Sequence, residues 1–136
     1  MPKAGDSFFA DLGESDTDWG QHRYTDTRPR IQDEGYIKIR ARDAYRLGIL
    51  SQRGTNHEDI FGVNLFYCSS PQGNLNCILR AQGTQGGNPN FAKQFSADKD
   101  LKLIGRWLKE IGAHAGDRIL VRWTSPVDIV LELIKE

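Results

Sequence analysis

The sequence predicts a single α+β domain that is mainly β with two or more short helices, folded as a barrel or a sandwich. Five or more short segments have the composition and alternation of β-strands, two isolated segments have helical spacing, and strands and helices do not alternate as they do in a doubly wound sheet. The length of 136 residues suits one domain around one core. We assign residues 22–136 to this domain and residues 1–21 to an acidic, poorly ordered tail.

The N-terminal part of the chain differs in charge from the rest. Residues 1–21 carry one lysine against five acidic side chains and few apolar ones, which is typical of a poorly ordered segment. The remaining chain has 17 basic and 13 acidic residues, although the formal net charge of the whole chain is zero. Residues 22–35, HRYTDTRPRIQDEG, are expected to form an exposed arm, because Pro29 favours an extended conformation at Arg28.

The first half of the domain is expected to contain a strand, a helix and a hairpin. Residues 36–41, YIKIRA, alternate polar and apolar side chains, as a strand with one wet face does. Residues 42–50, RDAYRLGIL, suit a short helix that ends at Gly48. Residues 60–68 and 74–82 suit two strands, and the turn residues of the connecting SSPQG predict that they form a hairpin.

The second half is expected to contain a long loop, a helix and a closing hairpin. Residues 83–95 are rich in glycine and amides and predict a polar loop. The following helix has Ser96 or Asp98 as its cap and ends at Gly112. Residues 118–123 and 127–134 suit two strands joined through the tight turn TSP. The apolar positions that recur at helical spacing are Leu101, Ile104, Leu108 and Ile111.

Several classes of protein are disfavoured by composition. No apolar run approaches the roughly 20 residues of a membrane helix, and the first residues lack the features of a secretory signal, so we expect a cytoplasmic protein. Cys68 and Cys77 fall in neighbouring predicted strands, where they could be reduced core residues or a disulfide; the missing signal favours the reduced form. Neither the cysteines nor the scattered histidines suggest a metal site, and we expect no cofactor for this domain.

Catalysis is the weaker hypothesis. The sequence contains none of the common nucleophile, zinc-protease, phosphate-loop or dinucleotide motifs. Asp100 and Lys102 match the acid-x-lysine triplet of metal-dependent nucleases by letter, but they fall in the predicted helix, where they suit a solvated face. His114 lies near a helix end, where an imidazole is more often a partner of the helix dipole than a general base. We therefore expect no enzymatic activity in this domain itself.

Recognition of nucleic acid fits the two polar segments better. Base edges are read by forked or amide side chains, with arginine suited to guanine, asparagine and glutamine to adenine, and carboxylates to cytosine. Both the arm before the first strand and the loop after the hairpin are rich in such side chains. The polar surface could also be ordinary, and Trp107 and Trp123 are interpreted as core residues rather than stacking platforms.

The order of elements resembles a known DNA-binding domain. An exposed arm leads into GYIKIRARDAYRLGI, followed by a hairpin, a polar arm, a tryptophan-containing segment and the closing GDRILVRW. This arrangement, over residues 22–134, is similar to the N-terminal effector-binding domain of EcoRII-type restriction endonucleases, a DNA-binding pseudobarrel shared with plant B-three transcription-factor domains. The resemblance implies sequence-specific binding of double-stranded DNA in the major groove through two arms, 22–34 and 83–95.

The resemblance also implies the DNA site and the partners. The family recognises 5′-CC(A/T)GG, and its DNA-binding domain is linked covalently to a nuclease domain, which would be the part that needs Mg²⁺. Here the second arm departs from the family, because it carries amides where the family has charged residues. The alternative is a protein–protein interaction module of a larger enzyme that does not read DNA.

Individual roles follow from the positions of the side chains in the two arms and the strands beside them. The base-reading candidates are Arg23, Asp26, Arg28, Arg30, Gln32, Asp33, Gln85, Asn88, Asn90, Lys93 and Gln94. The phosphate-binding candidates are Lys38, Arg40, Arg42 and Arg80.

Overall fold

The sheet of this protein curls into a nearly closed barrel. The computed structural model describes residues 2–12, 36–100 and 102–135. Within these residues the strands are β1 (Ser7–Asp11), β2 (Ile37–Lys38), β3 (Leu65–Ser69), β4 (Asn76–Gln82), β5 (Gln94–Ala97), β6 (Arg118–Ser125) and β7 (Asp128–Ile134). The helices are α2 (Ala41–Leu47) and α3 (Leu103–Glu110). The described part of the chain is therefore mainly β with two short helices, as the sequence predicts.

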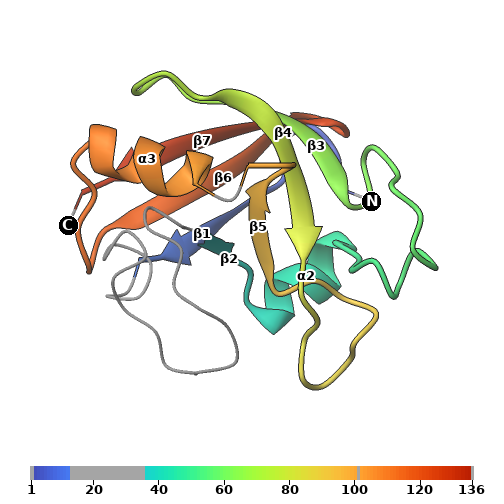
Figure 1. Ribbon diagram of the computed structural model, residues 1–136. Helices are drawn as coiled ribbons and strands as arrows, with labels where there is room; N and C mark the ends of the chain where they lie inside the picture. Colours follow the sequence, from blue (N-terminus) through green and yellow to red (C-terminus); the bar gives the residue numbers. More distant parts are fainter. Residues whose placement is uncertain (1, 13–35, 101, 136) are drawn as a thin grey trace.

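The strand order explains the shape. The seven strands form one sheet in the order β1-β6-β7-β3-β4-β5-β2, and neighbouring strands are antiparallel except for β3 and β7. The two edge strands, β1 and β2, lie close to each other, which nearly closes the barrel (Figure 1). Neither helix is long and apolar enough to cross a membrane within the described part of the chain.

Large aromatic side chains fill the barrel. Phe66 packs edge-on against both Phe95 and Trp123, with ring centroids 5.8 and 5.7 Å apart. Trp107, from α3, is also buried, and its indole N–H donates a hydrogen bond to the carbonyl of Gln72 at 2.7 Å. The interpretation of both tryptophans as core residues is confirmed.

The expectation of a poorly ordered N-terminal tail is wrong for residues 7–11. They form β1, which pairs with β6 over its whole length, and Phe8 packs against Trp123 at 6.0 Å between ring centroids. The prediction followed the acidic composition and missed the alternation of buried Phe8 and Ala10 with exposed Phe9 and Asp11, which is typical of a strand. Residue 1 and residues 13–21 of the expected tail lie outside the described residues.

Other boundaries agree in part. Helix α2 ends as expected at Gly48, whose φ of 70° and N–H bond to the Ala44 carbonyl form a left-handed cap. Both expected hairpins are present, as β3–β4 and β6–β7. The strand expected over residues 36–41 corresponds to the shorter β2, and the strand expected over 60–68 corresponds to β3, which begins only at Leu65.

The main correction is β5. Residues 94–97 were expected to end a loop and start a helix, but they form a strand between β2 and β4. Phe95 and Ala97 face the core opposite Ala81 and Leu79, so burial of these side chains favours a strand over the helix cap. Ser96 is fully buried in this strand, and α3 starts at Leu103 without a side-chain cap bond at its N-terminus.

Candidate nucleic-acid interface

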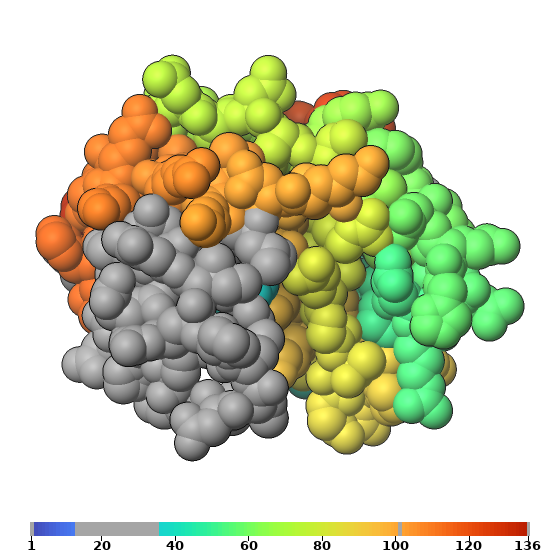
Figure 2. Space-filling model, in the orientation of Figure 1, coloured from blue at the N-terminus to red at the C-terminus, as the bar shows by residue number. Residues whose placement is uncertain are grey.

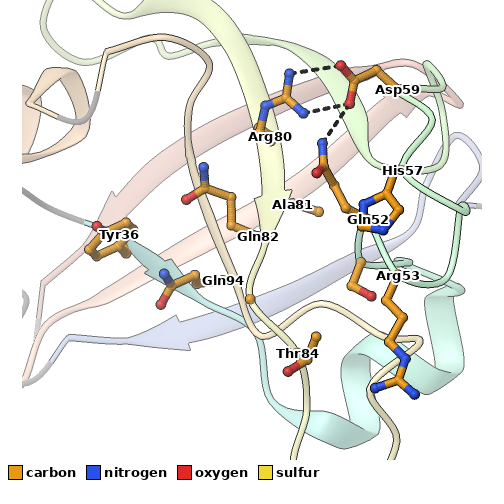
Figure 3. Close-up of a pocket in the computed structure, with 12 residues that line it drawn as sticks. Tyr36, Gln52, Arg53, His57, Asp59, Arg80, Ala81, Gln82, Thr84 and Gln94 are labelled. Carbon is orange, nitrogen blue, oxygen red and sulfur yellow. Dashed lines mark hydrogen bonds and ion pairs between the residues drawn. The ribbon is translucent and has the colours of Figure 1, made fainter. Parts of the chain in front are cut away.

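A polar cleft of about 890 Å³ lies on the outer face of the sheet, over β4 and β5 (Figure 3). The loop between α2 and β3 forms one side of it. Tyr36, the first described residue after the segment 13–35, lines the cleft. The lining residues are Tyr36, Ser51, Gln52, Arg53, His57, Asp59, Arg80, Ala81, Gln82, Gly83, Thr84 and Gln94.

A row of three polar side chains crosses the strands at the cleft. Gln94 of β5 lies opposite Lys38 of β2 on one side and opposite Gln82 of β4 on the other. Residues directly opposite in a sheet point to the same face, which is the outer face because the next residues, Ile37, Phe95 and Ala81, are buried. Neither glutamine amide bonds to any part of the described chain, so both have donors and acceptors available.

An ion-pair network fixes the side of the cleft. Arg80 donates two hydrogen bonds to the Asp59 carboxylate, at 2.6 and 3.1 Å, and a third to Asp98 at 2.8 Å. The hydrogen bonds from Arg80 are the main reason why the pKa of Asp59 is lowered. The bond to Asp59, followed by that to Asp98, raises the pKa of Arg80. Arg80 is therefore held between two carboxylates, and its binding of a phosphate stays a prediction.

The predicted residues of the first arm cannot be placed. Arg23, Asp26, Arg28, Arg30, Gln32 and Asp33 all lie outside the described residues.

The second arm, by contrast, divides into structural and available side chains. The Gln85 amide donates to the carbonyls of Ile39 and Ala92 at 2.7 and 3.0 Å, so it ties the arm to the barrel instead of facing a ligand. Asn88 accepts a bond from the backbone N–H of Asn90 through its side-chain oxygen, as in a local turn.

The remaining candidates of the second arm are more accessible. Asn90 and Lys93 are exposed, and Gln94 lies at the floor of the cleft. The alkyl chain of Lys93 packs over Gly83, where a Cβ would lie 2.9 Å from its Cγ. Gly83 has a φ of 69°, so this close approach and this backbone conformation both require glycine.

The other phosphate candidates lie at two places. Lys38 is exposed beside Gln94, but Arg40 forms an ion pair with Asp11 of β1. Arg40 and the exposed Arg42 line a separate, smaller pocket of about 300 Å³ between β1 and α2. The structure thus does not bring the four phosphate candidates together at the cleft.

Several cleft residues were not singled out as site residues. Arg53 and His57 belong to a polar loop whose composition is ordinary, so only its packing against the β4–β5 loop indicates a role. Gln82 belongs with them, since its position at the cleft depends on its register with Gln94.

Three sequence features can be compared with the structure. The thiols of Cys68 and Cys77 are free and lie directly opposite each other in β3 and β4. Asp100 accepts a hydrogen bond from the backbone N–H of Lys102, just before α3, so this triplet precedes the helix and serves its first turn. Among the described residues, no group of three or more histidine, cysteine or acidic side chains could hold a metal ion.

No protein-family model matches the sequence, and no curated protein matches it.

Proposed function

We propose that this domain binds double-stranded DNA sequence-specifically, with the cleft over β4 and β5 facing the edges of the bases. The observation that carries the proposal is the pair of glutamine amides, Gln82 and Gln94, which stand side by side at the cleft with no partner among the described residues. A glutamine amide can donate to N7 and accept from N6 of adenine in the major groove, which distinguishes adenine from the other bases.

The surroundings of the amides support this proposal. The second arm borders the cleft through Gly83 and Thr84, and Tyr36, which follows the first arm in the sequence, also lines it. Arg53 supplies the cleft with a positive charge suited to a polyanion, while the charge of Arg80 is balanced by Asp59 and Asp98. The resemblance to EcoRII-type effector domains makes 5′-CC(A/T)GG the first site to test, and its central pair supplies an adenine for one amide.

The biological setting follows from the same resemblance. In this proposal the domain recognises DNA for a type II restriction endonuclease, and a covalently linked nuclease domain cuts it. Magnesium would then be required by the linked domain and not for recognition. Binding should therefore be observable without a divalent metal ion.

A gel-shift titration tests the proposal. The chain is titrated against a duplex that contains CC(A/T)GG and against a scrambled duplex, at two salt concentrations and without magnesium. The matched variants are Gln82→Ala, Gln94→Ala and, as a control, Asn76→Ala at the opposite end of β4. Losing a base contact should cost about 1–3 kcal/mol and relax the preference at one position, whereas the control should bind like the wild-type chain. Equal binding of both duplexes by the wild-type chain would refute sequence-specific recognition.

A second candidate function, protein interaction, is favoured by one observation. Phe61 and Tyr67 stack at 4.7 Å between ring centroids with 18° between their planes, yet they remain 37% and 51% exposed. Exposed apolar patches often mark protein–protein contacts. This function predicts no duplex binding even at low salt, so the same titration distinguishes the two candidates.

A further inference from the structure

The loop between α2 and β3 is docked onto the second arm. The backbone N–H of Ser51 donates to the carbonyl of Asn90 at 3.0 Å, and its hydroxyl donates to the carbonyl of Pro89 at 2.6 Å. The Ser51 hydroxyl also accepts a bond from the N–H of Gly54. A Cβ on Gly54 would lie 2.1 Å from the Asn90 oxygen, so this packing requires glycine. The two loops therefore behave as one unit.

The other end of this loop is anchored to the sheet. Asp59 is held by Arg80 of β4 and by the side-chain amide of Gln52, which donates to it at 3.1 Å (Figure 3). Asn64 is fully buried and crosslinks the loop, since its side chain accepts from the N–H of Ile60 and donates to the carbonyl of Glu58. A loop anchored at both ends can hold its side chains in place before a ligand arrives.

Two basic side chains reach the cleft from this anchored loop. Arg53 and His57 are both exposed and line the cleft (Figure 3), and neither side chain has a hydrogen bond or ion pair to the described chain. His57 adopts a left-handed conformation, with φ of 66°, and its N–H bonds to the carbonyl of Gln52 at 2.6 Å. Asp59, the acid in the cleft lining, is already occupied by Arg80. The two side chains are therefore available to an anion in the cleft.

We infer that the loop Ser51–Asp59 is a third DNA-contacting element, in addition to the two arms, and that Arg53 and His57 contact phosphodiester groups of one strand. The inference rests on the proposed DNA binding. Arginine supplies a permanent positive charge, and an imidazole supplies at least one N–H donor. In the space-filling view, this green loop projects from the surface beside the yellow β4–β5 loop (Figure 2). A duplex that rests on the arms would thus meet Arg53 and His57 here.

The salt dependence of binding tests this assignment. The logarithm of the binding constant falls with the logarithm of the salt concentration, with a slope of about 0.9 for each phosphate contact. We would measure this slope for both duplexes with Arg53→Ala, Arg53→Lys and His57→Ala. Arg106→Ala is the matched control, because it removes an exposed arginine from α3, outside the cleft lining. Thermal unfolding confirms that each variant is folded.

The expected outcome is a specific pattern. Arg53→Ala should lower the slope by about one and weaken both duplexes by the same factor, Arg53→Lys should restore the slope, and His57→Ala should weaken both duplexes equally. The control should match the wild-type chain. Unchanged slopes and affinities in Arg53→Ala and His57→Ala would refute the third element while leaving DNA binding intact. If both Arg53 variants lost the preference for the specific duplex over the scrambled one, Arg53 would contact a base and not a phosphate. This result would also overturn the inference. If the wild-type chain binds neither duplex, the proposed function itself fails, and this inference fails with it.

Discussion

Replacing Arg80 by methionine should destabilise the fold by about 1.5–4 kcal/mol. The Arg80 side chain is 16% exposed and is bonded to Asp98, which is 15% exposed, and to Asp59, which is 43% exposed. A hydrogen bond to a charged group contributes about 1.5–3 kcal/mol, and the Asp98 bond belongs to this class. The Asp59 pair is open to solvent, so we discount it to about 0–1 kcal/mol. Methionine keeps most of the aliphatic packing, which limits the loss to the charged bonds.

The effect should also depend on pH. Arg80 lowers the pKa of Asp59 in the folded state. Because the folded pKa lies below the unfolded one, the pair stabilises the fold above the unfolded pKa, and this contribution is lost as the pH falls through the folded pKa. The difference in unfolding free energy between the wild-type chain and the variant should therefore shrink as the pH is lowered from neutral towards about 2.

Urea unfolding monitored by tryptophan fluorescence gives the required free energies. Arg122→Met, which removes an exposed arginine from β6, is the matched control and should change stability by less than about 0.5 kcal/mol. Arg80→Lys retains the charge but not the planar fork, so it should recover only part of the loss. A change in Arg80→Met as small as that of the control would refute the reasoning about the network.

Three further predictions concern the loops and the thiols. Gly54→Ala should destabilise the chain by about 1–3 kcal/mol in urea unfolding, because its Cβ would overlap a backbone oxygen of the facing loop. The control is Gly86→Ala, where a Cβ meets nothing within 4 Å, and it should be neutral or stabilising. Equal changes in unfolding free energy for the two variants would contradict the close packing at Gly54. Gln85→Ala should lower stability by about 1–2 kcal/mol, since it leaves two backbone carbonyls without their donor. An unchanged unfolding midpoint would show that the Gln85 amide does not hold the arm to the barrel. Iodoacetamide should label Cys77 before Cys68. The hydrogen bond from Cys68 lowers the pKa of Cys77, whereas the same bond and burial raise the pKa of Cys68. Peptide mapping by mass spectrometry gives the order of labelling, and the reverse order would contradict the prediction.

Local chemistry made much of the fold predictable. Gly48 marks the end of α2, and the turn residues mark the hairpins, because these signals act within a few residues of sequence. Strands β1 and β5 were missed for a different reason. Each is short and has only two buried side chains facing the core, so its strand conformation depends on pairing with β6 or β4. Pairing of this kind is a tertiary interaction that local propensity does not reveal.

The cleft was predictable only in part, and its amides show why. Gln85 and Gln94 belong to the same arm and have the same side chain, so composition gives them the same role. In the structure the Gln85 amide bonds to the carbonyl of Ile39 and holds the arm against the barrel. Gln94 belongs to β5, where its register places it beside Gln82 on the outer face. Whether an amide holds the fold together or can read a base is thus decided by strand pairing. A sequence pattern can predict that an arm is polar, but only the register shows which of its side chains are available to a ligand.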